Sequence, residues 1–156
     1  MFNSFSNYLT VEHIYNLTFS CIPNKNGLYI VKKPKGMKIV ISPNTTAIAE
    51  YKGSSMLYNE DILLSKYQQS DREILYIGKA GGNRNKLKQR IRQFVKYGYC
   101  LVDNHRGGRA IWQIENNKTL LLGFVECDNP EKKENDLLTK YLLNYGVLPL
   151  ANWKIG

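Results

Sequence analysis

A chain of 156 residues is long enough for one domain with its own core and too short for two ordinary domains. Its apolar fraction of 43% is typical of globular proteins, and no stretch is long and apolar enough to predict a transmembrane helix. The 22 basic and 13 acidic residues leave a net charge of +9, which favours a polyanionic partner.

The N-terminal residues and the cysteines predict a cytoplasmic protein. Residues 1–20 lack the charged and apolar regions of a secretory signal. The cysteines, Cys21, Cys100 and Cys127, are odd in number and widely spaced, so they match no zinc pattern. Reduced thiols in the cytoplasm are the simplest account of them.

The first half of the chain predicts two helices and two strands. Residues 8–18 have the spacing of a short amphipathic helix. Residues 27–33 predict a strand whose side chains alternate between two faces. A short strand at 38–41 and a helix at 57–66 follow.

The second half begins with a short apolar strand at 74–78, which we expect to be buried. Apolar residues at helical spacing predict a helix at 86–97. The segments 110–115 and 119–126 then have the pattern of two strands joined as a hairpin.

The last helix has boundary signals at both ends. Asn129 suits the N-cap, Pro130 suits the first helical position, and Gly146 suits the end of the helix. Together the elements predict an α/β fold of the α+β sandwich kind, with a small, mostly antiparallel sheet flanked by helices. We expect residues 1–156 to form a single domain.

Most of the excess positive charge lies between Lys79 and Arg109, where there are nine basic residues and one acid. A concentrated basic patch attracts a nucleic-acid backbone. The tyrosines and glycines within the segment also favour a binding surface. The alternative is a solvated basic helix face without a partner.

Two charged residues lie on otherwise apolar helix stripes. Glu134 is one turn before Leu138, and Arg90 is one turn before Phe94, so both side chains border the core. Such placement is costly unless a partner compensates the charge. Three alternatives remain: a glutamate favoured by the helix dipole, Glu131 as the functional acid, and a structural salt bridge between Arg90 and Glu134.

These residues, taken in order, resemble the GIY-YIG nuclease family. The resemblance covers residues 27–152 apart from 34–73, and its GIY element has leucine in the middle place. In chain order the matching residues are Gly27-Leu28-Tyr29, Tyr76-Ile77-Gly78, Arg90, Glu134 and Asn152. The closing residues and the segment 107–114 are also similar to a bacterial branch that includes restriction-type endonucleases.

The resemblance implies a metal-dependent endonuclease that leaves a 5′-phosphate and a 3′-hydroxyl. Glu134 would bind Mg²⁺ or Mn²⁺, and Arg90 would stabilise charge on the phosphate. Tyr29 would be the general base, with its pKa lowered by nearby cations, and Tyr76 would orient the water or share the proton. Asn152 would hold Glu134 or close the end of the last helix.

The partner implied is DNA, most naturally double-stranded, and the chain is either a monomer or a homodimer. Basic residues beside the motifs would contact it, together with one histidine in the loop before the 110–115 segment. These predicted DNA-binding residues are Lys79, Lys86, His105, Arg106 and Arg109.

Two departures from the family pattern matter. Residues 34–73 separate the tyrosine motifs and must loop out of the sheet, which suggests a DNA-recognition element. Phe94 stands where the family often has Tyr or His, and His105 is a candidate substitute. Both departures keep open an alternative, a catalytically weak or inactive DNA-binding module, and an RNA-associated protein is a third interpretation.

Overall fold

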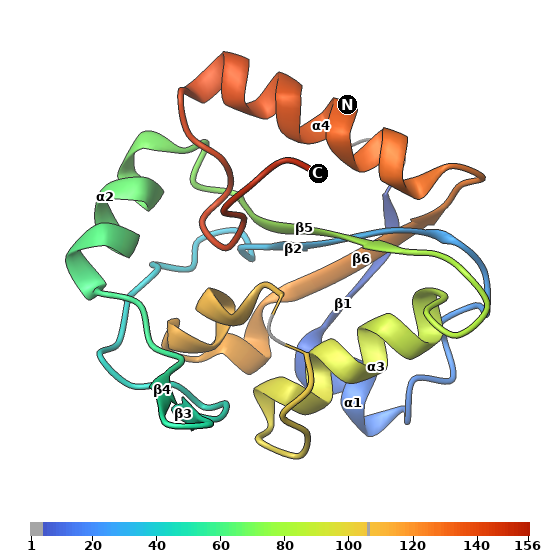
Figure 1. The fold of residues 1–156 in the computed structure, drawn as a ribbon, viewed down its shortest axis with the longest axis horizontal. Helices are drawn as coiled ribbons and strands as arrows, with labels where there is room; N and C mark the ends of the chain where they lie inside the picture. The colour runs from blue at the N-terminus through green and yellow to red at the C-terminus, as the bar shows by residue number, and fades with distance from the viewer. Residues whose placement is uncertain (1–4, 106) are drawn as a thin grey trace.

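The computed structural model describes residues 5–105 and 107–156 and has a four-stranded sheet at its centre (Figure 1). The strands lie in the order β1 (Ser6–Thr10), β6 (Leu121–Glu126), β2 (Gly27–Lys32) and β5 (Ile74–Ala80), and every neighbouring pair is antiparallel. The predicted α+β class is thereby confirmed. In the described part of the chain, no helix is long and apolar enough to cross a membrane.

Helices cover both faces of the sheet, as Figure 1 shows. One face packs on α1 (Val11–Asn16) and α3 (Leu87–Gly98), and the other packs on α4 (Pro130–Tyr145). The predicted alternation in β2 is confirmed, because Tyr29 and Val31 belong to the core beside α3, whereas Leu28 and Ile30 belong to the core beside α4. The sheet therefore separates two apolar layers.

The signals read at the ends of the last helix are also confirmed. The side chain of Asn129 accepts a hydrogen bond from the Lys132 N–H at 3.3 Å, and Pro130 is the first helical residue. Gly146 follows the helix with φ of 75°, a conformation that glycine adopts without a steric penalty.

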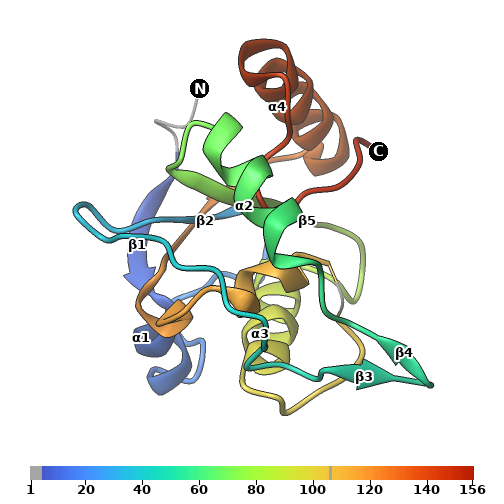
Figure 2. The ribbon, with the colours of Figure 1, turned by 90° about the vertical axis from the view of Figure 1, so that its left-hand side faces the viewer.

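Residues 34–73 add no strand to the central sheet. They form a small hairpin of β3 (Glu50–Tyr51) and β4 (Ser54–Ser55), followed by α2 (Glu60–Gln69). Figure 2 shows the hairpin projecting from the rest of the molecule, whereas α2 lies beside the sheet. Leu63 of α2 is buried in the main core, so this helix is part of the packed structure.

Three predicted elements were wrong in part or in whole. Residues 6–10 join β6 as a strand, so the helix predicted at 8–18 begins only at Val11, with Thr10 as its cap. The strand predicted at 38–41 is reduced to one bridge between Ile41 and Ile114. Pairing with distant segments decides strands, and local pattern cannot show it.

The predicted hairpin of 110–115 with 119–126 does not form. The first segment lies in a 3-10 helix, η1 (Arg109–Gln113), a second 3-10 turn, η2 (Asn117–Thr119), follows, and only β6 is a strand. Its partners are β1 and β2. Four consecutive residues of η1 from Ala110 are buried, and such a run resembles a core strand in sequence.

Candidate active site

A cavity of about 730 Å³ lies at the free edge of β5, where α3 and α4 approach each other from opposite faces of the sheet. The C-terminal residues and the segment before α2 complete its wall. Six of the site residues predicted from the sequence line it together: Tyr76, Lys79, Arg90, Arg109, Glu134 and Asn152. These side chains are distant in the sequence, so only the fold brings them to one place.

Glu134 reaches the cavity from the first turns of α4. Its side chain shares the buried face of the helix with Leu138 and Tyr141, as the spacing predicted, and it is 9% exposed. Burial raises the pKa of this carboxyl, Lys79 and Arg90 lower it, and Glu131 raises it further. Among the described residues Glu134 has no hydrogen bond or ion pair, so its charge is only partly compensated.

Arg90 reaches the same cavity from α3. The salt bridge considered as an alternative does not form, because the described ion pairs join Lys79 to Glu131 at 3.7 Å and Lys132 to Asp136 at 3.0 Å. The guanidinium nevertheless acts on the pKa of both Glu134 and Tyr76 through space. Arg90 is therefore close to the acid and not neutralised by it.

The two tyrosines differ in access to the cavity. Tyr76 lines the cavity, whereas Tyr29 lies beneath it and is fully buried. The centroids of the Tyr29 and Tyr76 rings are 5.9 Å apart. The Tyr29 hydroxyl makes no hydrogen bond of normal geometry with a described residue, although Tyr76 is near enough to affect its pKa.

The expected lowering of the Tyr29 pKa is contradicted. Burial raises it to about 12, although Arg90 and the Tyr76 hydroxyl lower it. Burial also raises the pKa of Tyr76 well above its usual value, and the Tyr29 hydroxyl and Glu134 add to the rise. Desolvation outweighs the effect of the Arg90 guanidinium, so both phenols stay protonated near neutral pH.

Close packing fixes the Tyr29 ring. The ring lies across Gly78 of the neighbouring strand, and a Cβ at that position would be 2.4 Å from Tyr29 Cζ. Phe94 is also fully buried and stacks on Tyr76, with ring centroids 5.5 Å apart and an angle of 16° between the planes. The close approach of the Tyr29 ring therefore explains why glycine occupies position 78. Phe94 supports the two tyrosines from α3.

Asn152 is engaged with β5. Its side-chain Oδ1 accepts from the Ile77 N–H, and its Nδ2 donates to the Ile77 carbonyl, both at 2.9 Å. The adjacent Ala151 N–H donates to the Leu75 carbonyl at 2.8 Å. The expectation that Asn152 holds Glu134 or closes the last helix is therefore wrong, because its amide is used on the free edge of the strand that carries Tyr76.

The predicted DNA-binding residues differ in where they lie. Lys79 and Arg109 line the cavity, whereas Lys86 precedes α3 and faces a neighbouring depression. Arg106 lies outside the described residues. Direct DNA contact by His105 is contradicted, because its side chain is 2% exposed and packs edge-on against Phe94. Burial and the charge of Arg90 lower its pKa to about 3, so the imidazole is neutral.

Three aromatic or apolar wall residues were missed in the sequence: Met56, Tyr58 and Trp153. Tyr58 and Trp153 stack with ring centroids 4.6 Å apart and an angle of 21° between the planes. The Arg109 guanidinium lies 4.4 Å from the Tyr58 centroid, and its Nε donates to the Met56 carbonyl at 3.0 Å. No motif contains them: Met56 and Tyr58 lie within residues 34–73, and the available signal for Trp153 was its place next to Asn152.

The described residues hold no cluster of three or more His, Cys, Asp or Glu side chains suited to a metal ion. Glu134 is the one acidic side chain among the described residues that line this cavity, so a cation there would keep most of its water ligands, a mode that Mg²⁺ tolerates. Comparison of the chain with protein-family models, with curated proteins and with solved structures gave no match.

Proposed function

We propose that this chain is a metal-dependent DNA endonuclease of the GIY-YIG type, and that it hydrolyses phosphodiester bonds in the cavity at the edge of β5. One observation carries the proposal: Glu134 and Arg90 line the same cavity from opposite layers and do not pair with each other. A carboxylate and a guanidinium held apart in this way can each serve a different partner, a cation and a phosphate.

Glu134 would hold the cation, Mg²⁺ or Mn²⁺. Its carboxylate is mostly buried, has a raised pKa and forms no ion pair with a described residue, so a bound cation would compensate its charge. A divalent ion supplies charge stabilisation at the phosphate and lowers the pKa of bound water. Lys79 is already held beside α4 by Glu131, which keeps a second positive charge at the cavity.

Arg90 would bind the phosphate that is attacked. A guanidinium donates two parallel hydrogen bonds to non-bridging oxygens, which a lysine cannot match. Lys79 lines the same cavity and would add a point charge. Together they would stabilise the charge that develops in the transition state.

Tyr76 would orient water or the phosphate by hydrogen bonding, with Tyr29 behind it as a support. Tyr29 would not act as a base with a lowered pKa, because burial raises that pKa to about 12. The phenols therefore act as protonated donors and acceptors near neutral pH. Loss of either hydroxyl is expected to slow cleavage less than loss of Glu134.

The test uses purified protein and supercoiled plasmid DNA with MgCl₂ or MnCl₂. Glu134→Gln should lower the cleavage rate by about 10²- to 10³-fold while DNA binding, measured by fluorescence anisotropy, persists. Glu131→Gln is the matched control, since this neighbouring acid is 71% exposed and should leave most of the activity. Equal rates for wild type and Glu134→Gln would refute the site.

A second pair of variants tests the arginine. Arg90→Lys keeps the charge but loses the fork of donors, so cleavage should fall about tenfold or more with little loss of DNA affinity. Arg92→Lys on the exposed side of α3 is the control. If both variants cleave alike, Arg90 does not bind the reacting phosphate.

The alternative function is a DNA-binding module without cleavage. The buried Phe94 and the raised pKa values of both tyrosines favour it, because neither phenol can act as a base near neutral pH. Metal-independent binding without cleavage of linear, supercoiled and branched DNA would support this alternative. Stronger binding to RNA of equal length would support the RNA-associated interpretation instead.

Double-stranded DNA is the proposed partner, and restriction-type cleavage of both strands remains part of the proposal. It would need either a homodimer or two sequential nicks by a monomer. Sedimentation of the DNA complex distinguishes these two arrangements. A DNA substrate is also compatible with the cytoplasmic location that the cysteine pattern predicted.

A further inference from the structure

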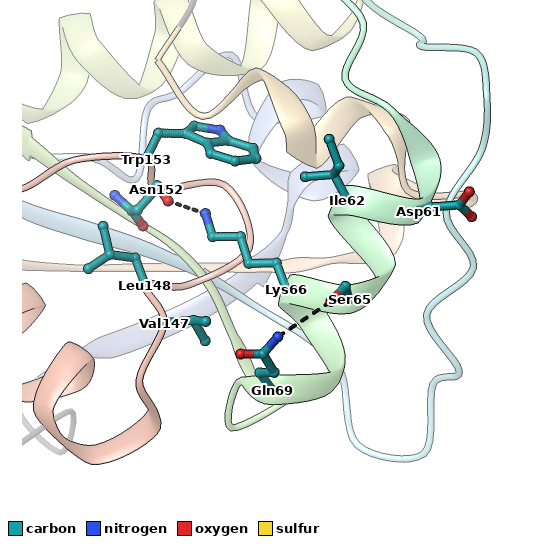
Figure 3. A pocket seen from close by; sticks show the side chains of 9 residues that line it. All are labelled: Asp61, Ile62, Ser65, Lys66, Gln69, Val147, Leu148, Asn152 and Trp153. Carbon is teal, nitrogen blue, oxygen red and sulfur yellow. Dashed lines mark hydrogen bonds between the residues drawn. The ribbon is translucent and has the colours of Figure 1, made fainter.

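Lys66 of α2 is directed at the C-terminal segment (Figure 3). Its ammonium donates to the Leu150 carbonyl at 3.0 Å and to the Asn152 carbonyl, and it lies 3.8 Å from the centroid of the Trp153 ring. No described carboxylate pairs with it. Backbone carbonyls and an aromatic face therefore satisfy this partly buried cation, so the contacts are directed at one short stretch of chain.

The stretch that Lys66 holds is the one that binds the free edge of β5. Ala151 bonds to the Leu75 carbonyl, and the side chain of Asn152 makes both of its hydrogen bonds with Ile77. Tyr76 lies between these two points of attachment. A shift of the segment by part of an ångström would therefore be passed to Tyr76 through three hydrogen bonds.

The same lysine also fixes the outer wall of the cavity. Trp153 has the Lys66 ammonium close to its ring and stacks on Tyr58. Tyr58 in turn lies under the Arg109 guanidinium. Removing the Lys66 ammonium would thus loosen Trp153 as well as Asn152, and both line the cavity that contains Glu134.

We propose that Lys66 is a positioning residue for the reaction: it clamps residues 150–153 onto β5 and so sets the place of Tyr76 in the cavity. This role makes the 34–73 segment a structural part of the site, in addition to any contact with DNA. The catalytic half of the proposal, that Lys66 affects the reaction, rests on the proposed function. The mechanical half, that Lys66 clamps residues 150–153 onto β5, can be measured without cleavage.

The experiment compares Lys66→Met with Lys66→Arg and with Lys140→Met, a control that removes an exposed lysine of α4. Methionine keeps the length and apolar packing of the stem, so the fold should survive. The first readout is amide hydrogen exchange by NMR. In Lys66→Met, protection of the Ile77 and Ala151 amides should fall about tenfold, while Val31 in the central strand keeps its protection.

The second readout is the steady-state rate of cleavage with Mg²⁺. Lys66→Met should lower kcat about 10- to 100-fold with KM nearly unchanged, because misplacement affects the reacting geometry more than DNA affinity. Lys66→Arg retains a cation at this position and should recover much of kcat. Lys140→Met should match wild type in both readouts.

Each outcome decides the proposal. Unchanged protection at Ile77 in Lys66→Met would overturn it, and so would lost protection with a wild-type kcat. A fall in both protection and kcat, with recovery by arginine, would establish it. If wild-type protein cleaves no DNA, the proposed function fails and the catalytic half fails with it, while the exchange data still show whether Lys66 fixes β5.

Discussion

Two aromatic groups meet at the candidate site, and they are built in opposite ways. The inner group lies under the cavity, where Tyr29, Tyr76 and Phe94 pack on one another and are nearly or fully buried. The outer group consists of Tyr58 and Trp153, which are partly exposed and stacked.

Among the described residues, cations lie over the rings of the outer group and over none of the inner group. Arg109 lies over Tyr58 and Lys66 lies over Trp153, so each of the two stacked rings has one cation beside it. The inner group is instead held by close packing, which tolerates little change in volume. The inner group therefore forms a rigid floor of the cavity, which places the Tyr76 hydroxyl. The outer group forms a more adjustable wall, which would face a bound substrate.

The largest expected effect is on the floor. Phe94→Ala should lower the free energy of unfolding by about 3–5 kcal/mol, because it removes a fully buried ring that contacts Tyr29, Tyr76 and Trp112. Urea denaturation of wild type and variant measures the difference. Trp153→Ala in the wall is the comparison, and an equal loss there would show that the two groups are not distinct.

Gly78→Ala should test the fit of the floor without removing any ring. The new methyl group would collide with Tyr29 Cζ, so we expect a loss of about 1–3 kcal/mol in unfolding free energy. The cost should shrink when Tyr29→Ala is already present, because the obstructing ring is gone. Urea denaturation of the two single variants and the double variant gives this coupling, and additive costs would refute the steric explanation.

Much of the floor, and the charged residues beside it, could be predicted from the sequence. Alternation in residues 27–33 placed Tyr29 on the correct face, and helical spacing placed Glu134 and Arg90 beside the core. Local periodicity carries such information because it depends only on neighbours along the chain. It also gave the class of fold.

The wall could not be predicted from local periodicity. Tyr58, Trp153 and Lys66 come from segments that no periodic pattern links, and they meet only after α2 has docked beside the C-terminal segment. The direction of the shift in the Tyr29 pKa was predicted wrongly for a related reason. Motifs reveal a nearby arginine, whereas the depth of burial, which dominates here, is a property of the whole fold.

His105 offers a pH test of the floor. Its folded-state pKa of about 3 lies below the ordinary 6.5, so protons bind the unfolded state more readily as the pH falls. Stability is therefore lost from about pH 6.5 downward. Between pH 7 and pH 5, wild type should lose about 2 kcal/mol more than His105→Gln.

The measurement is urea denaturation at several pH values. His13→Gln is the matched control, because it removes the other histidine of the chain, whose side chain is exposed. Parallel curves for wild type and His105→Gln would mean that His105 can bind a proton in the folded state, and the floor would then be open to water.

The smallest effect is expected in the wall. Arg109→Gln removes a charge over Tyr58 and changes the contact with the Met56 carbonyl, yet it should cost only about 0.5–1 kcal/mol, as is usual for partly exposed cation–π pairs. Arg109→Lys, which keeps the charge, should cost less. Urea denaturation measures both. A loss near that of Phe94→Ala would contradict the proposed difference, because the wall would then be as tightly determined as the floor and could not adjust to a substrate without unfolding part of the site.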